Sequence, residues 1–303
     1  MAANTRDIRR RIKSVKNTAQ ITKAMQMVAA SKMRRAQAAA LAGRPYAEQL
    51  NKVLGALSGS SAGNDAFTHE LLENRGEGKE LVILISTDKG LCGALNTNLF
   101  REGSRFSAEN TIFIAVGRKG AQFLNRGRRE VLAEFELKDN FSFMDSKAVS
   151  KFAMDKFLSG EVNKVTVLFT DFVNTLTQIP RARTILPITS LEVTADVMGS
   201  DEAKMANTHA AAVEDGTATE YLFEPSPSGV LGGILPHYVH FQVFQMALDS
   251  RASEHSARMV AMKSATDNAK QLIKDLTLEY NKVRQASITT EILEIATAQM
   301  VLS

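Results

Sequence analysis

The chain has 303 residues, of which 44 % are hydrophobic and 23 % are charged, and its formal net charge is +4. This composition is that of an ordinary globular protein and excludes intrinsic disorder as the dominant state. The single cysteine, Cys92, excludes a disulfide framework and any site built from several cysteines. The sequence contains no run of about 18 apolar residues, which is the length that a membrane-spanning helix needs.

The first predicted element is a long N-terminal helix, because residues 1–42 contain neither glycine nor proline. Apolar and small residues recur there in steps of three and four, which is typical of a coiled-coil seam. The seam consists of Ile8, Ile12, Val15, Ala19, Thr22, Gln26, Ala29, Met33, Ala36 and Ala40. A second apolar stripe, Ile21, Met25 and Val28, lies beside this seam and predicts contact with a partner.

The same segment is strongly basic. Residues 1–44 carry eleven Lys or Arg side chains against one acid, Asp7. Such a surface favours an acidic partner or the phosphates of a nucleic acid. An Arg-rich, acid-poor N-terminus is also typical of a mitochondrial presequence, although the helical pattern continues past any plausible cleavage point.

The middle of the chain predicts a Rossmann-like α/β domain over residues 78–195. Continuous apolar runs at 81–86, 112–116 and 165–170 have the length of strands, and amphipathic segments lie near 94–107, 119–126 and 146–159. Alternating strands and helices indicate a parallel sheet covered by helices. Residues 196–220 are polar and are predicted to form a loop or insertion.

No catalytic or cofactor-binding signature is present in this domain. The motif Gly90-Leu-Cys-Gly93 follows the first strand but matches neither common phosphate-binding loop, so we interpret it as a tight turn. His237 and His240 lack a third ligand nearby. We therefore expect no catalytic residue, no cofactor and no metal.

The last predicted element is a second long helix, because residues 237–303 again lack glycine and proline. Its seam is Met262, Thr266, Ala269, Ile273, Leu276, Tyr280, Val283 and Ser287. A helix of this length would span roughly 100 Å, which exceeds any globule the chain could build. The expected fold is therefore α/β, with a long antiparallel coiled coil formed by helical regions 1–57 and 221–303. The alternative is that each helix packs only on the α/β domain.

The end of the second helix is unusually apolar. Ile288, Ile292, Leu293 and Ile295 cover a broad arc there, and no Lys or Arg follows Arg284. Because chain ends are normally polar, this tip predicts an enclosing partner.

Three groups of motifs resemble the gamma subunit of F-type ATP synthases. They are Ile8-Arg-Arg-Arg-Ile12 through Ile21-Thr-Lys-Ala-Met25 to Val28-Ala-Ala-Ser-Lys32, then Ser86-Thr-Asp-Lys-Gly-Leu-Cys-Gly93, and finally Arg258-Met-Val-Ala-Met-Lys263 with Tyr280-Asn-Lys-Val-Arg-Gln-Ala-Ser-Ile-Thr289. The resemblance covers the whole chain in order.

The resemblance implies a non-catalytic rotor subunit, the central stalk. Its coiled coil would turn inside a ring of alpha and beta subunits, and its α/β domain, with the epsilon subunit, would stand on the membrane c-ring. Proton flow through the c-ring would then drive the catalytic beta subunits through their conformations. The location implied is peripheral, on the cytoplasmic face of a bacterial inner membrane or on the matrix side in a mitochondrion.

The resemblance also implies roles for individual residues. Lys23 and Met25 would meet an acidic lever segment of a beta subunit, and Arg284 and Gln285 would hydrogen-bond a loop of an open beta subunit. Arg258, Thr289 and Glu291 would lie on the face that affects coupling.

Two other classes of protein remain as alternatives at this stage. The first is a basic helical nucleic-acid-binding protein, whose affinity would fall steeply with salt. The second is a small-molecule α/β enzyme with an oligomerisation coil, which lacks a visible nucleophile, base or cofactor loop.

Overall fold

The computed structural model describes residues 5–43, 45–47, 49–50, 53, 69–76, 78–139, 141–188 and 227–302. The chain divides into two compact units. Unit 1 comprises residues 1–29 and 258–303, and unit 2 comprises residues 30–257. The loop expected at 196–220 lies outside the described residues.

Unit 2 contains a five-stranded sheet in the order β3-β2-β1-β4-β5. The strands are β1 (Glu80–Ile85), β2 (Thr111–Val116), β3 (Val131–Phe135), β4 (Lys164–Phe172) and β5 (Gln178–Leu186). The first four are parallel and β5 is antiparallel to β4. This order is that of a Rossmann-like sheet, which confirms the predicted fold class. The sequence pattern predicted β1, β2 and β4 but missed the two edge strands.

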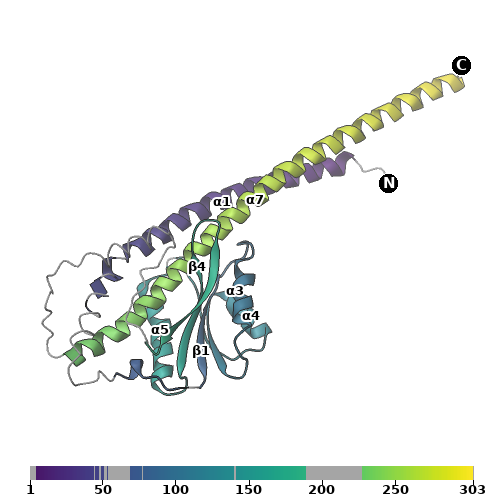
Figure 1. Ribbon diagram of the computed structural model, residues 1–303. Helices are drawn as coiled ribbons and strands as arrows, with labels where there is room; N and C mark the ends of the chain where they lie inside the picture. The colour runs from purple at the N-terminus through teal and green to yellow at the C-terminus, as the bar shows by residue number, and fades with distance from the viewer. Residues whose placement is uncertain are drawn as a thin grey trace. The chain divides into compact units, whose positions relative to one another are not determined.

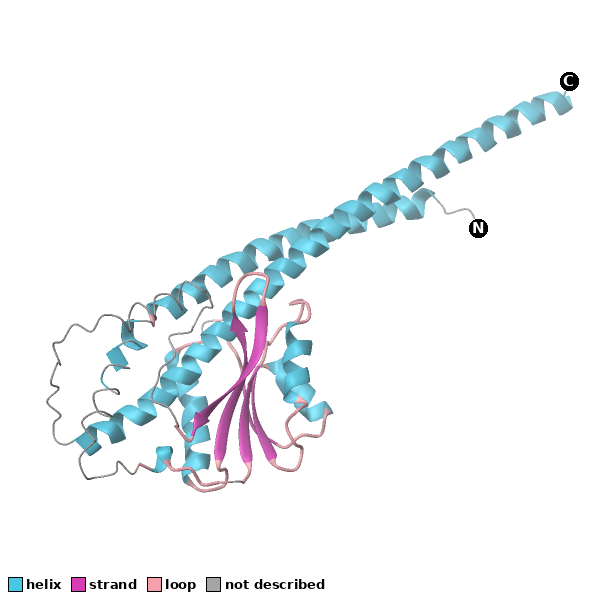
Figure 2. Cartoon of the chain, in the orientation of Figure 1, coloured by secondary structure: helices cyan, strands magenta, loops and turns pink. Residues whose placement is uncertain are grey.

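Helices cover both faces of this sheet (Figure 2). Side chains alternate along β1, so that Leu81, Ile83 and Ile85 enter one core while Val82 and Leu84 enter the other. The smaller core is closed by α3 (Leu95–Gly103) and α4 (Arg118–Arg126). The larger core is closed by α5 (Phe143–Leu158) and by the first part of α7, and a short 3-10 helix, η1 (Glu70–Leu72), adds Leu71 to it.

Two long helices, α1 (Thr5–Ala42) and α7 (Pro227–Leu302), contribute to both units (Figure 1). The last helical region was expected over residues 221–303, and the described helix α7 begins at Pro227 and contains Pro236 in its interior. A proline inside a helix removes one hydrogen bond and crowds the carbonyl group four residues before it. For Pro236, the residue four positions earlier is Gly232, which is followed by Gly233. We attribute the tolerance of a proline inside α7 to the conformational freedom of these two glycines.

Within unit 2, α7 is buried on nearly all sides from residue 238 to residue 256. The buried residues include polar side chains: Asp249, Ser250, Arg251, Ser253, Glu254, His255 and Ser256. Two of these donate to carbonyl groups of the sheet, Ser250 to Ile85 (3.5 Å) and Ser253 to Thr170 (3.1 Å). Burial raises the pKa of Asp249 well above its usual value, and the nearby Asp171 raises it further. Both effects favour the protonated form of this carboxyl group.

Candidate functional site

The two segments of unit 1 form an antiparallel helical pair. The hydroxyl groups of Thr22 and Thr266 lie 2.7 Å apart, and Arg9 Nη2 donates to the Tyr280 hydroxyl over 2.7 Å. From the first contact to the second, the residue number falls along α1 from 22 to 9 and rises along α7 from 266 to 280, so the two helices are antiparallel. The Arg9 guanidinium also lies 5.5 Å from the centre of the Tyr280 ring, a cation–π distance.

The predicted seam is confirmed along α1, where all ten positions are buried or partly buried. On α7 the prediction holds from Met262 to Val283, but Ser287 is exposed. The register explains the difference. Because Arg9 already pairs with Tyr280, the described part of α1, which starts at Thr5, ends before Ser287 is reached.

The end of α7 is a single helix whose residues 284–299 are all exposed. It carries an apolar tip, which we define as Ile288, Ile292, Leu293 and Ile295, with exposed fractions of 46–65 %. On α1, Ile21 and Val28 of the second stripe are also more than half exposed. Unit 1 therefore presents two apolar surfaces that its own helices do not cover.

The sequence-predicted contact residues all lie in unit 1. Lys23 is exposed and Met25 is partly buried on α1, while Arg258 is partly buried at the start of the unit's α7 segment. The remaining four, Arg284, Gln285, Thr289 and Glu291, are exposed along two turns of the unpaired helix. In this group the Thr289 hydroxyl donates to the Gln285 carbonyl oxygen over 2.9 Å.

In unit 2, the residues that follow β1 cap the N-terminus of α4, the helix that follows β2. The first three amide N–H groups of α4 are bonded there: Arg118 to Asp88 Oδ1 (2.9 Å), Lys119 to the Thr87 carbonyl (3.0 Å) and Gly120 to Ser86 Oγ (2.7 Å). These are the donors that bind anions at a helix N-terminus. The sequence predicts a tight turn at the Gly90–Gly93 motif and carries no signal for the capping role of Asp88.

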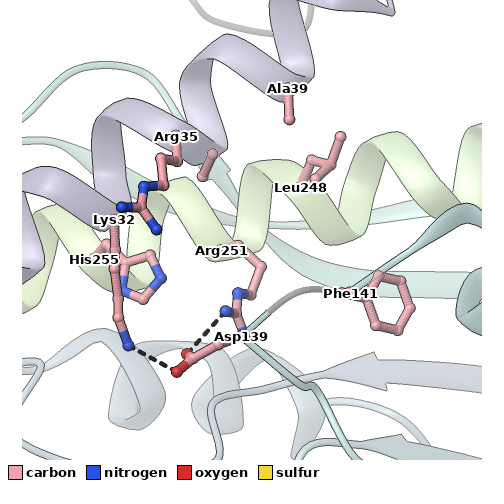
Figure 3. Close-up of a pocket in the computed structure, with 9 residues that line it drawn as sticks. Lys32, Arg35, Ala39, Asp139, Phe141, Leu248, Arg251 and His255 are labelled. Carbon is pink, nitrogen blue, oxygen red and sulfur yellow. Dashed lines mark hydrogen bonds and ion pairs between the residues drawn. The ribbon is translucent and has the colours of Figure 1, made fainter.

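A pocket in unit 2 is lined by side chains from α1, α7 and the segment after β3 (Figure 3). At its floor, Asp139 Oδ2 accepts from Lys32 Nζ (2.7 Å) and Asp139 Oδ1 accepts from Arg251 Nη2 (3.1 Å). The hydrogen bond from Lys32 lowers the pKa of Asp139 to about 2, helped by the charges of Lys32 and Arg251. The carboxylate is therefore ionised throughout the physiological range. Sequence patterns gave no signal for this cluster.

The described residues form neither a metal-binding cluster nor a membrane-spanning helix. No three His, Cys, Asp or Glu side chains there are grouped to hold a metal ion. Of the two histidines considered above, His240 is buried against α5, where its Nδ1 lies 2.7 Å from Ser150 Oγ, and burial lowers its pKa. No helix of the described segments has the length and hydropathy of a membrane span.

The fold is that of a Rossmann-like domain joined to a pair of long antiparallel helices, and comparison with known proteins identifies its family. The family model described as ATP synthase matches residues 4–302. The ATP synthase gamma chain of Methylacidiphilum infernorum is 48 % identical over 302 residues, covering 98 % of both chains, and that of Opitutus terrae is 49 % identical over 297 residues. The chain therefore belongs to the ATP synthase family, among its gamma chains.

Solved structures share the fold at lower sequence identity. The Euglena gracilis mitochondrial ATP synthase structure titled OSCP/F1/c-ring matches 98 % of this chain and 94 % of that chain, with a TM-score of 0.62 and 18 % identity. The central stalk/c-ring structure from Tetrahymena thermophila matches 81 % of this chain, with a TM-score of 0.59 and 24 % identity. None of the relatives or structures named here supports the nucleic-acid-binding alternative.

The close packing at the start of α4 gives a first prediction. Gly117 has a φ of 99°, and a Cβ atom there would overlap the Ser86 carbonyl oxygen. We expect Gly117→Ala to lower the free energy of unfolding by about 2 kcal/mol or more. Gly90→Ala in the neighbouring loop is the control, because nothing lies within 4 Å of its added Cβ. Urea denaturation followed by circular dichroism measures both, and equal stabilities would contradict the packing argument.

The Thr22–Thr266 contact gives a second prediction. Each hydroxyl also lies within hydrogen-bonding distance of a carbonyl oxygen of its own helix, Thr22 of Ala19 (3.2 Å) and Thr266 of Met262 (2.8 Å), and either hydroxyl can donate to the other. We expect Thr22→Val and Thr266→Val each to destabilise the helical pair by about 0.5–1.5 kcal/mol. The double variant should lose less than the sum, because no partner is left unpaired. Amide hydrogen exchange at 262–283 provides the measurement, and strict additivity would show that the hydroxyl groups do not interact.

Proposed function

We propose that this gamma chain is the central-stalk rotor subunit of a proton-translocating F-type ATP synthase. In this role it couples rotation of the c-ring to conformational cycling of the catalytic beta subunits. The observation that carries the proposal is the unpaired, exposed end of α7 with its apolar tip. A helix with apolar side chains around a broad arc is stable in water only when another surface encloses it. A ring of alpha and beta subunits provides such a surface.

The mechanism requires different contacts at different rotation angles. A shaft can bias a neighbour's conformation only if its interaction free energy differs between that neighbour's states. Unit 1 meets this requirement because its surface is asymmetric: the Ile21–Val28 stripe lies on α1, and the tip lies on α7 alone. The chain itself performs no chemistry in this scheme. Nucleotide binding and hydrolysis occur on the partners.

The remaining parts of the proposal concern position in the complex. Unit 2, with its α/β domain, would stand with the epsilon subunit on the c-ring, so the chain is peripheral to the membrane. For a bacterial chain this corresponds to the cytoplasmic face of the inner membrane. The bacterial relatives named above support this assignment.

Arg284 and Gln285 give the test of this proposal. Both are exposed on the unpaired helix immediately before the apolar tip, where a planar guanidinium and an amide can hydrogen-bond a loop of a beta subunit. We expect Arg284→Ala and Gln285→Leu each to lower steady-state ATP turnover about tenfold or more, which corresponds to about 1.4 kcal/mol. Arg284→Lys should rescue turnover only partly, because a point charge cannot reproduce the fork of a guanidinium.

The measurement is the ATPase rate of purified complexes of normal subunit stoichiometry. Lys282→Ala is the matched control, since Lys282 is exposed on the same helix just before this pair. Wild-type turnover in both test variants would rule out the proposed contact. A lower rate accompanied by loss of subunits would indicate an assembly defect instead.

Met25 gives a further prediction on the α1 side. It is the partly buried member of the second apolar stripe, between the exposed side chains of Ile21 and Val28. Met25→Lys would place a cation against an acidic segment of a beta subunit. A charge-assisted hydrogen bond in a partly buried site contributes about 1–3 kcal/mol. We expect the substitution to impair coupling more than assembly of the complex. Coupling is measured as the number of protons pumped per ATP hydrolysed in inverted membrane vesicles. Met27→Lys, at a position 60 % exposed, is the control. Unchanged coupling in Met25→Lys would argue against the contact.

A further inference from the structure

The pocket of unit 2 has properties that the rotor function does not use. Its volume is about 240 Å³. Its walls come from α1, from the segment after β3 and from α7, and all lie within unit 2. The lining residues are Lys32, Arg35, Ala36, Ala39, Asp139, Phe141, Leu248, Arg251 and His255.

Cationic side chains converge on this space. Lys32 and Arg35 from α1 and Arg251 from α7 turn toward the same side of the pocket, close to His255 (Figure 3). The carboxylate of Asp139 balances one of the three positive charges, so the pocket has a surplus of two. No ion pair joins Arg35 to any other described residue, and its side chain is exposed.

The Arg251 guanidinium is held rigidly at the floor. Its side chain is only 5 % exposed, its Nη1 donates to the Leu137 carbonyl over 2.8 Å and its Nη2 to Asp139. A guanidinium has five N–H donors, and these two bonds use two of them. A buried, oriented cation with donors to spare beside a second, exposed arginine is the arrangement that recognises an oxyanion with several acceptor oxygens.

The geometry points to a binding site for a phosphate group, and we propose that this pocket binds inorganic phosphate or the phosphate of a small phosphorylated molecule. Two arginines and a lysine can together satisfy a doubly charged tetrahedral anion, which the surplus of two positive charges matches. The volume is below the range of about 300–1,000 Å³ typical of pockets for larger ligands, so the occupant is small. The apolar wall of Ala36, Ala39, Phe141 and Leu248 leaves room for a short carbon body beside the phosphate.

The pocket is distinct from the N-terminus of α4, where helix amide groups could bind a phosphate. Those amide groups are already bonded by Ser86, Thr87 and Asp88. A ligand here would instead join α1 to α7 and to the segment after β3. A ligand that binds the folded chain and not the unfolded chain would raise the free energy of unfolding of unit 2.

The test measures phosphate binding to the full chain by isothermal titration calorimetry, with chloride replaced so that ionic strength stays constant. We expect saturable binding of one phosphate per chain. Arg35→Gln should weaken it at least tenfold, whereas Arg34→Gln, an exposed neighbour that does not line the pocket, should leave it unchanged. Asp139→Asn should tighten binding, because it removes the only negative charge of the lining, and loss of structure would not produce this gain.

Two further titrations identify the source of the phosphate group. ADP and glycerol phosphate are titrated in the same way, and tighter binding of either than of inorganic phosphate would assign the site to a phosphate ester. Binding that does not saturate, or that Arg35→Gln leaves unchanged, would overturn the proposal. The same comparison is made in the assembled complex, where bound phosphate is measured for the wild type and for Arg35→Gln. If the isolated chain binds phosphate at this pocket but the two complexes bind equal amounts, the proposal is overturned. A partner's acidic side chain would then be the occupant of the pocket.

Discussion

Burial of the central part of α7 is the constraint on which the rest of the structure depends. Between residues 238 and 256 this helix is covered on nearly all sides, and it supplies Tyr238, Val239 and Met246 to the larger core of unit 2. A helix anchored in this way has a fixed axial rotation and a fixed position along its axis. Within unit 2, this packing determines which side chains of α7 contact the sheet.

The seam of unit 1 combines small and polar residues with large apolar ones. Ala269 and Thr266 are buried beside Met262 and Leu276, and the Thr22–Thr266 hydrogen bond lies among them. Such a seam allows close approach of the helices and fixes their register through directional contacts. A fixed register also determines where α1 stops covering α7. The exposed tip is thus a consequence of unequal helix lengths and of the antiparallel register together.

The α/β domain has the architecture of a nucleotide-binding protein, but its helix N-terminus is filled by its own chain. Asp88, Thr87 and Ser86 satisfy the amide groups of α4 that would otherwise bind a phosphate. Three basic side chains of the domain, Lys32, Arg35 and Arg251, line a pocket beside Asp139, where segments far apart in the sequence meet. Fold similarity alone would therefore direct attention to the N-terminus of α4 and not to this pocket.

Much of the architecture was determined by the sequence itself. The steps of three and four residues along α1 and α7, and the apolar runs of β1, β2 and β4, follow from local periodicity, and the structure confirms them. The edge strands could not be found in this way, since β5 contains Pro180 and β3 is only partly buried, so neither has a continuous apolar run. The inclusion of Pro236 within α7 has no signal in the local pattern, because a proline usually ends or kinks a helix.

For the candidate sites the division is similar. The sequence predicted that Arg284 and Gln285 contact a partner, and both are exposed on the last part of α7. The sequence could not determine that Ser287 lies beyond the described start of α1, because register depends on both helices at once. The cluster of Lys32, Asp139 and Arg251 has no sequence signature, since Lys32 and Arg251 lie 107 and 112 residues from Asp139. Local patterns determined which elements form, and only the tertiary structure decided which side chains meet, because those meetings depend on long-range packing that no single segment encodes.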